Sequence, residues 1–273
     1  MIRYDRETLR RIQLIQLDML KEVDRICRKL GIRYDIIAGT LLGAVRNGGF
    51  IPWDDDADVA MLRDEYDRFV TACRVELNTD KYYFQDHTVT PGYRWGYGKL
   101  RRKDSVFLRE NQEMMPYEQG IFIDIFPLDS VPDKYIPRAL KNAECFCVRK
   151  TLYSPVGAVA SKSPVSRAVY RMLSNIPEER VLAYYDGMIK RAKRKKTDHV
   201  RILMFPTPNR SYSYLRAWYE ESEDIMFEGA RFSAIKDHDG YLTFKYGEYM
   251  KLPPVEERKI HPVTVLRIPE DEI

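Results

Sequence analysis

The sequence predicts an α+β fold with a mixed-sheet core, flanking helices and a mostly helical C-terminal region. Three observations support this class. Apolar residues recur at three- and four-residue steps over residues 5–30, the spacing of an amphipathic helix. Short apolar segments separated by polar or proline-bearing turns follow between residues 82 and 125, as expected of strands. From Asp133 onward the pattern changes to long helical stretches.

The first elements alternate between helix and strand. Asp5 is a suitable cap for the helix over 5–30, and Gly31 suits the left-handed residue just past its end. Arg33–Ala38 is short and apolar and therefore predicts a strand. A short helix over Leu41–Arg46 follows it.

The remaining elements are assigned by the same patterns. The predicted strands are Ala57–Met61, Tyr82–Gln85, Tyr93–Leu100, Ser105–Arg109 and Gly120–Ile125. The predicted helices run from Asp64 to about Leu77 and over about 134–152, 164–174 and 177–195. We therefore expect a core with its N-terminal helix over residues 1–130, and a helical region over 131–273 that packs back on it.

Composition excludes several classes of protein. The 273 residues can bury a sizeable core, and 44% hydrophobic with 32% charged residues argues against a disordered or fibrous chain. The formal net charge of +4 is too small to indicate nucleic acid as a partner. It suits an anionic substrate or a weak attraction to acidic lipid headgroups.

The cysteines and the N-terminus indicate a reducing, cytoplasmic environment. No signal-peptide core and no stretch of membrane-spanning length is present. One residue separates the third and fourth cysteines, and no histidine cluster lies nearby, which is a poor zinc spacing. We expect four reduced core cysteines, which are Cys27, Cys73, Cys145 and Cys147.

Four carboxylates lie within residues 54–58, and they are the sharpest chemical feature of the chain. Such charges repel one another, so a folded protein keeps them together only when something positive compensates. An acidic solvated turn is the alternative. However, Asp56 and Asp58 are two residues apart at the start of an apolar strand, so their side chains point to one face. A same-face pair at a sheet edge suits Mg²⁺, which takes one or two carboxylates plus phosphate oxygens.

Two further motifs accompany this pair. Gly39 and Thr40 follow a strand and open a short helix, where backbone N–H groups can hold a phosphate, although an ordinary helix cap is the alternative. Arg46 lies just beyond and could reach the same anion. Asp124 is isolated in an apolar run, where a charge must be paired or bound to metal, and an ion pair with an arginine is the competing interpretation. Asp129 is expected to cap a turn.

This order of elements, a strand, a Gly-Thr helix, an aspartate pair and a later lone aspartate, is that of the nucleotidyltransferase fold. The stretch AGTLLGAVRNGGFIPWDDDADVAMLRDEYDRF closely resembles the LicD family of phosphotransferases. The stretches GIFIDIFPLD and YLTFKYGEYMKLPPVEERKIHP resemble the family's other two blocks. Two departures occur: Ala57 stands where isoleucine is common, and Asn47-Gly48 stands where a His-Lys pair is often seen. Neither removes a carboxylate, but loss of the basic pair would alter contacts with the donor or acceptor.

The resemblance implies a metal-dependent transferase that moves a phospho-alcohol, most familiarly phosphocholine, from a CDP-linked donor to a hydroxyl group. The acceptor would be a cell-surface glycan, such as lipopolysaccharide or teichoic acid, or its lipid-linked precursor. Asp56, Asp58 and Asp124 would bind Mg²⁺, with Mn²⁺ as an alternative, and would carry catalysis. Asp124 would also accept the hydroxyl proton. CDP-choline is the favoured donor.

Residues that would bind the substrates come from the same blocks. Gly39, Thr40 and Arg46 would hold the donor phosphates. Lys99 and Arg101 alternate on one face of a strand and could meet phosphate, with a solvated surface as an equal alternative.

Aromatic residues could recognise the quaternary ammonium of choline by cation–π attraction. Those near the acidic motif or in the strands around it are Trp53, Trp95, Tyr97 and Tyr117. His87 lies in a polar turn and is not expected to be catalytic. His261 is expected either to close the site or to cap a turn.

The basic run Lys190–Lys196 ends a helix and complements its dipole, which makes a solvated helix end the default interpretation. Weak peripheral contact with an anionic membrane is the alternative. Other functions also stay open: transfer of another phospho-alcohol or a phosphonate, nucleotidyl transfer, or catalytically silent binding on the same fold. The silent alternative ranks lowest, because none of the three carboxylates is missing.

Overall fold

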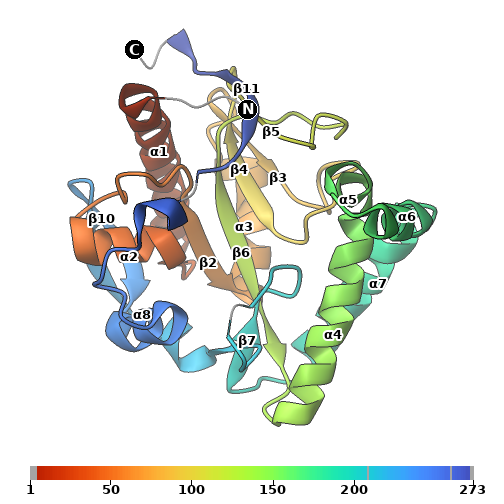
Figure 1. Cartoon of the computed structure of the whole chain (residues 1–273). Coiled ribbons are helices and arrows are strands. Elements are labelled where there is room, and N and C mark those ends of the chain that lie inside the picture. Colours follow the sequence, from red (N-terminus) through yellow and green to blue (C-terminus); the bar gives the residue numbers. More distant parts are fainter. Residues whose placement is uncertain (1–4, 208, 259, 271–273) are drawn as a thin grey trace.

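The structure, a computed structural model, describes residues 5–207, 209–258 and 260–270. A mixed sheet stands at its centre, with helices packed around it (Figure 1), so the predicted α+β class is confirmed. The helices are α1 (Arg6–Leu30), α2 (Ala38–Asn47), α3 (Arg63–Glu76), α4 (Tyr135–Leu152), α5 (Ser154–Ala160), α6 (Pro164–Leu173), α7 (Glu178–Lys193) and α8 (His238–Tyr246). Short 3-10 turns cover Arg216–Tyr219 and Val255–Glu257.

The strands come from both ends of the chain. They are β1 (Asp35–Ile36), β2 (Asp58–Leu62), β3 (Tyr82–Gln85), β4 (Gly98–Arg102), β5 (Val106–Arg109), β6 (Phe122–Val131), β7 (His199–Arg201), β8 (Tyr214–Leu215), β9 (Ser222–Phe227), β10 (Ala230–Ile235) and β11 (Val263–Arg267). The sheet order is β3-β4-β6-β2-β1-β10-β9, with β7 on the far part of β6 and β8 on β7. The β2–β6 and β1–β10 pairs are parallel and the other pairs are antiparallel. Strands β5 and β11 form a separate ribbon.

The helices form groups around this sheet. Helix α1 packs on α3, and together they contact β2, β4 and β6. Its buried residues recur at helical spacing, as the sequence predicts, and Asp5 and Gly31 cap its two ends. Helix α2 packs against α8 and β9. Helices α4–α7 stand together at one side of the molecule (Figure 1), where α7 contacts β6 and encloses a second, smaller hydrophobic core with α4.

The predicted element boundaries differ most from the observed ones at β1, β4 and β6. Strand β1 keeps only two of the six predicted residues, because α2 begins at Ala38 and includes Gly39 and Thr40. Strand β4 begins at Gly98 rather than Tyr93, since residues 90–93 form a turn. Strand β6 runs on to Val131, because β7 pairs with its far end.

Helices appear in the C-terminal half where the sequence predicts them, but the strands there were not anticipated. Strands β7 to β10 fall between α7 and α8, and β10 pairs with β1 in the central sheet. These strands are short or half-exposed, so they lack the apolar runs that mark a strand in the sequence.

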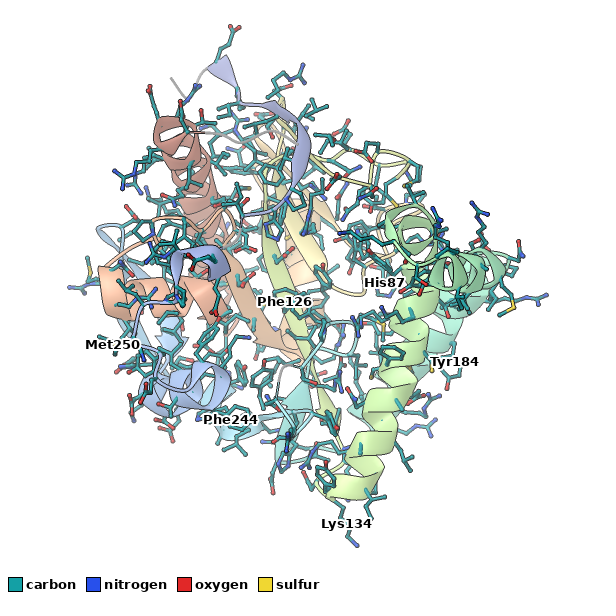
Figure 2. All side chains as sticks on the ribbon, viewed as in Figure 1. His87, Phe126, Lys134, Tyr184, Phe244 and Met250 are labelled. Atoms are coloured by element: carbon teal, nitrogen blue, oxygen red, sulfur yellow. The ribbon has the colours of Figure 1, made fainter. Side chains whose placement is uncertain are left out.

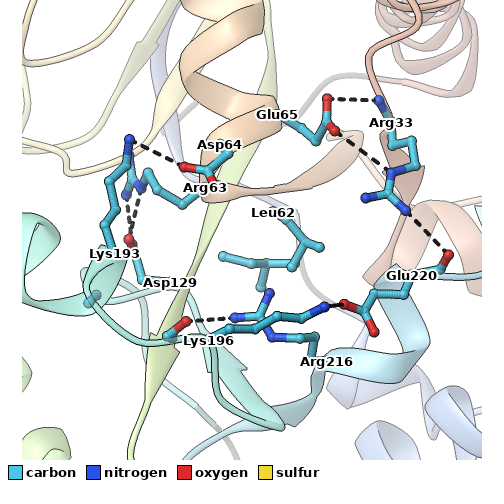
Figure 3. Close-up of a pocket in the computed structure, with 13 residues that line it drawn as sticks. Arg33, Leu62, Arg63, Asp64, Glu65, Asp129, Lys193, Lys196, Arg216 and Glu220 are labelled. Atoms are coloured by element: carbon cyan, nitrogen blue, oxygen red, sulfur yellow. Dashed lines mark hydrogen bonds and ion pairs between the residues drawn. The ribbon is translucent and has the colours of Figure 1, made fainter.

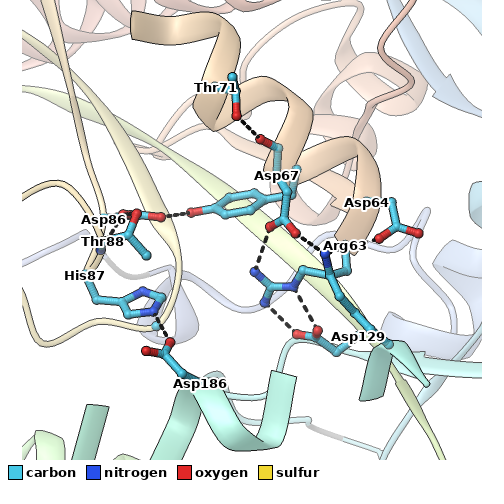
Figure 4. A network of polar contacts seen from close by, with 12 residues as sticks. Arg63, Asp64, Asp67, Thr71, Asp86, His87, Thr88, Asp129 and Asp186 are labelled. Atoms are coloured by element: carbon cyan, nitrogen blue, oxygen red, sulfur yellow. Dashed lines mark hydrogen bonds and ion pairs between the residues drawn. The ribbon is translucent and has the colours of Figure 1, made fainter. Parts of the chain in front are cut away.

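Two expectations about single residues are wrong. Asp129 does not cap a turn: it lies fully buried in β6 and accepts hydrogen bonds of 2.8 and 2.6 Å from the guanidinium of Arg63 (Figure 4). Cys147 is not in the core. Cys145 faces the second hydrophobic core, and Cys147, two residues further along α4, points to solvent.

Candidate active site

Two neighbouring strands bring the acidic motifs together. Strands β2 and β6 run parallel, in a register that places Asp58 beside Asp124. The N–H of Asp124 donates to the carbonyl oxygen of Ala57 at 2.9 Å, which fixes that register at its first residue. The predicted carboxylates, which come from motifs far apart in the sequence, therefore meet at the amino ends of β2 and β6.

The carboxylates of this cluster disturb one another. Burial, together with the charges of Asp56 and Asp124, raises the pKa of Asp58 well above its usual value. Burial and the neighbouring charges of Asp56 and Asp55 have the same effect on the pKa of Asp54. Burial also raises the pKa of Asp56, whose side chain nevertheless keeps 23% of its surface exposed. The cluster is thus both open to a ligand and in need of positive charge.

Helix α1 holds the acidic loop in place. Gln13 donates to the carbonyl oxygen of Asp54 at 2.9 Å. Gln16, a buried polar residue of α1, donates to the carbonyl oxygens of Asp55 at 2.7 Å and Phe122 at 3.2 Å. One buried amide therefore ties the acidic loop to β6, the strand that carries the third carboxylate.

The first turn of α2 lies against the same cluster. Thr40 accepts a hydrogen bond of 2.8 Å from the N–H of Asp58. A Cβ atom at Gly39 would stand 2.5 Å from an oxygen of Asp54, so only glycine lets the carboxylate approach this closely. Ala38 begins the helix with a φ of +51°, a left-handed conformation that is uncommon for alanine. The N-terminus of α2 therefore lies directly against the carboxylates.

Asp124 is paired with a lysine. Lys99 lies opposite Asp124 on β4, and its ammonium group makes an ion pair with that carboxylate. The ammonium also sits 3.4 Å from the centre of the Phe122 ring. Burial lowers the pKa of Lys99 to about 8. The alternative offered for Asp124 was an ion pair with an arginine. Asp124 does form a buried ion pair, but its partner is a lysine.

The carboxylates of the cluster suit a magnesium ion that takes its remaining ligands from the substrate. In the part of the chain that the structure describes, no group of three His, Cys, Asp or Glu side chains forms a ready-made cage. Mg²⁺ commonly uses one or two carboxylates and takes its other ligands from phosphate and water. Asp56 and Asp58 could supply these two carboxylates, whereas Asp124 is paired with Lys99.

Comparison with known proteins agrees with this geometry. The model of the LicD/FKTN/FKRP nucleotidyltransferase domain matches residues 31–160. The lipopolysaccharide cholinephosphotransferase LicD of Haemophilus influenzae is 30% identical over 257 residues, which cover 93% of this chain and 96% of the relative. An uncharacterized protein of Rickettsia prowazekii is 43% identical over 47 residues, 17% of this chain and 18% of its own. An uncharacterized protein of Rickettsia typhi is 40% identical over 63 residues, 23% of this chain and 20% of its own.

The chain belongs to the LicD family. The resemblance seen in the sequence is confirmed, and the chain is an enzyme of the phosphotransferase class. The matched domain spans α2, β2 and β6, the elements that hold the acidic cluster.

Two predicted binding residues of this LicD-family chain, Arg46 and Arg101, have partners outside the acidic cluster. Arg46 is in the last turn of α2, roughly 10 Å along the helix axis from Gly39, and donates to the carbonyl oxygen of Tyr249 at 3.1 Å. Arg101 is buried and donates to Gln85 and to the carbonyl oxygen of Gly120. These contacts give both arginines structural partners, and their roles in substrate binding stay predictions.

Lys99 and Arg101 are not on a solvated surface, which was the alternative for both. Each is only 3% exposed. The guanidinium of Arg258 lies over the Trp53 ring, 4.3 Å from the centre of that ring. One face of the proposed aromatic cage is therefore already covered by a cation of the protein itself.

Two residues that were not assigned to the site complete the acidic loop. Asp55 is buried and accepts hydrogen bonds of 2.9 Å from both the ring and the backbone N–H of His261. The other ring nitrogen of His261 is 3.7 Å from Asp56. Of the two alternatives offered for His261, closing the site is the one that the structure favours. In the sequence, His261 was indicated by the third LicD-like block, which contains it.

A small aromatic pocket of about 50 Å³ adjoins Asp58. Phe126, near the middle of the molecule in Figure 2, and Phe205 line it, and their rings are 5.1 Å apart. Tyr214 and Lys245 complete the polar side, with 3.3 Å between hydroxyl and ammonium. Sequence reasoning missed this pocket, because its residues come from β6, α8 and the segment after β7.

A larger hollow of about 240 Å³ lies away from the acidic cluster, at the carboxyl ends of β2 and β6 (Figure 3). Its charged side chains are joined in ion pairs, such as Arg33 with Glu65 and Lys196 with Glu220. With the polar groups already paired, this hollow gives no indication of a second catalytic centre.

Proposed function

We propose that this chain transfers phosphocholine from CDP-choline to a hydroxyl group of a cell-surface glycan or its lipid-linked precursor. The Haemophilus influenzae relative, named a lipopolysaccharide cholinephosphotransferase, supports the transferred group and the glycan acceptor. The observation that carries the proposal is the register of β2 and β6, which sets Asp58 beside Asp124 with Asp56 as their charged neighbour.

Mg²⁺, with Mn²⁺ as the alternative, is the cofactor that we propose. Asp56 and Asp58 would hold it, because Asp124 is paired with Lys99 and Asp55 is paired with His261. When bound, the ion would neutralise charge on the donor pyrophosphate and lower the pKa of the attacking hydroxyl.

The protein's own groups would position the reactants. The first turn of α2 lies close to Asp54 and Asp58, and its backbone N–H groups at Gly39 and Thr40 would bind donor phosphate oxygens. The acceptor oxygen bonds to the phosphorus that carries choline, the bond from that phosphorus to CMP breaks, and CMP leaves with the electron pair. The hydroxyl proton passes to a carboxylate, for which we assign Asp124, the partner of Lys99.

The pocket beside Asp58 is our candidate for the choline end of the donor. Ring faces attract a quaternary ammonium, and Phe126, Phe205 and Tyr214 are grouped there. A volume of about 50 Å³ is small for this group, so binding would require the rings to move apart, and Phe205 is 39% exposed and can do so.

Release of CMP from a panel of CDP-alcohols, with Mg²⁺ or with EDTA, tests the proposal. We expect metal-dependent release that is fastest with CDP-choline and is lost in Asp56→Asn. Asp80→Asn, on an exposed turn, is the matched control and should behave as wild type. Equal release in EDTA would contradict the metal site. Preference for another CDP-alcohol would contradict phosphocholine.

The alternatives have separate signatures in the same assay. Another phospho-alcohol or a phosphonate would change which donor is used but not the release of CMP. Nucleotidyl transfer would attach the nucleoside monophosphate to the acceptor, which product analysis would detect. A silent binding protein would release nothing from any donor, even with crude glycan acceptors.

A further inference from the structure

Helix α6 lies at the outer edge of the α4–α7 group (Figure 1), and none of its residues is buried. Tyr170 is its anchor to the protein. The Tyr170 ring packs so tightly on Gly157 of α5 that a Cβ there would stand 2.6 Å from it. The Tyr170 hydroxyl accepts a hydrogen bond of 2.9 Å from Lys150. The side of α6 that faces the molecule is therefore defined by Tyr170.

The opposite side of α6 is apolar and exposed. At about 100° per residue, Val165, Val169 and Met172 lie roughly 100–160° around the helix from Tyr170. They are 74%, 45% and 65% exposed. An amphipathic helix normally buries its apolar side, so these residues form a surface without a partner among the described residues.

The charge around this surface has one sign. Residues 145–177 include no Asp or Glu, and their basic residues are Arg149, Lys150, Lys162, Arg167 and Arg171. Lys162, Arg167 and Arg171 make no ion pair within the described ranges. On the helical wheel, Arg167 and Arg171 lie on the same side of α6, about 60° and 100° around from Tyr170 and between it and Met172.

The basic run Lys190–Lys196, expected from the sequence to be the membrane contact if there is one, differs in this respect. Lys193 pairs with Asp64 and Asp67, and Lys196 pairs with Glu220; Figure 3 shows the pairs with Asp64 and Glu220. The charge of this run is therefore partly neutralised by the protein itself, whereas that of α6 is not.

We propose that α6 lies on the surface of an anionic lipid bilayer, with Val165, Val169 and Met172 inserted between the headgroups and with Arg167 and Arg171 at lipid phosphates. A basic amphipathic helix with an exposed apolar side has the chemistry of such a surface. No described helix is both long and apolar enough to cross a membrane. A symmetric contact between two copies is disfavoured, because it would face these unpaired cations toward one another.

Vesicle flotation tests this inference without any turnover, so its outcome is independent of the proposed transferase activity. The wild-type chain should float with vesicles of phosphatidylcholine plus phosphatidylglycerol and not with phosphatidylcholine alone. Val169→Gln with Met172→Gln should weaken binding at least tenfold, because the inserted apolar area is lost. Arg167→Gln with Arg171→Gln should weaken it about fivefold per arginine and reduce its salt dependence.

The matched control is Arg74→Gln with Val75→Gln, the same change of chemistry at exposed positions of α3, and it should float like wild type. Thermal unfolding should show that all three variants fold. No flotation of wild type with anionic vesicles would overturn the inference, as would α6 variants that float like wild type. A dimer in light scattering that the Val169/Met172 variant dissociates, without vesicle binding, would reassign this surface to a contact between copies.

Discussion

At the scale of the residue, the acidic cluster shows function arranged at the expense of stability. Asp58 is surrounded by the charges of Asp56, Asp124 and Asp54, and burial adds to their effect in raising its pKa. Like charges held together cost folding free energy when no cation is bound. Lys99 offsets only part of this cost, since it is paired with Asp124.

Asp58→Asn should therefore remove activity while it stabilises the metal-free protein. We expect loss of at least a thousandfold in CMP release and a gain of about 1 kcal/mol in the free energy of unfolding at neutral pH. Urea unfolding in EDTA and the CMP assay measure the two effects. A variant that is both inactive and less stable would show that the mutual repulsion is already compensated by other contacts.

The two candidate aromatic sites can be separated by single substitutions. Phe205→Ala should raise the KM for CDP-choline more than that for CDP-ethanolamine, since a quaternary ammonium has no N–H groups for hydrogen bonds and depends more on the ring faces. Trp53→Ala should affect both donors equally, because Arg258 already covers the Trp53 ring. If instead Trp53→Ala affected CDP-choline more and Phe205→Ala affected both donors equally, the choline site would lie at Trp53.

At the scale of the element, buried polar groups decide how the strands join. Asp35 lies in β1, between β2 and β10, and is almost fully buried. Burial raises its pKa to about 7, although hydrogen bonds from Ser222 and Ser233 oppose this change. In the unfolded chain this carboxyl would have its ordinary value of 3.8.

The sign of the resulting pH dependence follows from proton binding. Between about pH 4 and pH 7 the folded state holds a proton on Asp35 that the unfolded state has lost, so stability falls as the pH rises. Above pH 7 the buried charge of Asp35 lowers the free energy of unfolding by its full amount. This amount is about 4 kcal/mol, because a pKa difference of one corresponds to about 1.4 kcal/mol.

Asp35→Asn should remove this dependence. Relative to wild type, the variant should gain stability progressively from pH 4 to pH 7 and keep that gain above it. Urea unfolding across this range measures the difference, with Asp80→Asn as a control whose difference from wild type should not vary. A gain that is constant with pH would exclude titration of Asp35 as the cause.

At the scale of the whole molecule, the site is closed by the end of the chain. His261 lies in the segment before β11 and reaches the acidic loop, where it donates to Asp55 and faces Asp56. Strand β11 is anchored on β5, so the position of this histidine depends on a ribbon outside the main sheet.

His261→Ala should lower CMP release by about tenfold or more while reducing the free energy of unfolding by only about 1.5–3 kcal/mol, the usual contribution of a hydrogen bond to a charged group. His261→Asn, which keeps a donor, should recover stability better than activity. The CMP assay and urea unfolding distinguish these effects. Unchanged activity in His261→Ala would show that this segment only covers the site.

Features that depend on local pattern and on motif spacing could be predicted from the order of residues alone. The amphipathic period of α1, the same-face pair Asp56 and Asp58, and the isolated Asp124 were all visible in the order of residues. The helices α3, α4, α6 and α7 were placed within a few residues for the same reason. These features arise from neighbours in the chain, so a linear pattern can record them.

Which of these residues contact one another depends on the tertiary structure. Lys99 finds Asp124 through the β4–β6 register, and Arg63 finds Asp129 across a helix–strand contact. His261 reaches Asp55 from the far end of the chain. The energy of a buried ion pair depends on distances between elements that no local pattern encodes, which is why Asp129 was mistaken for a cap, and Lys99 and Arg101 could not be told from surface residues.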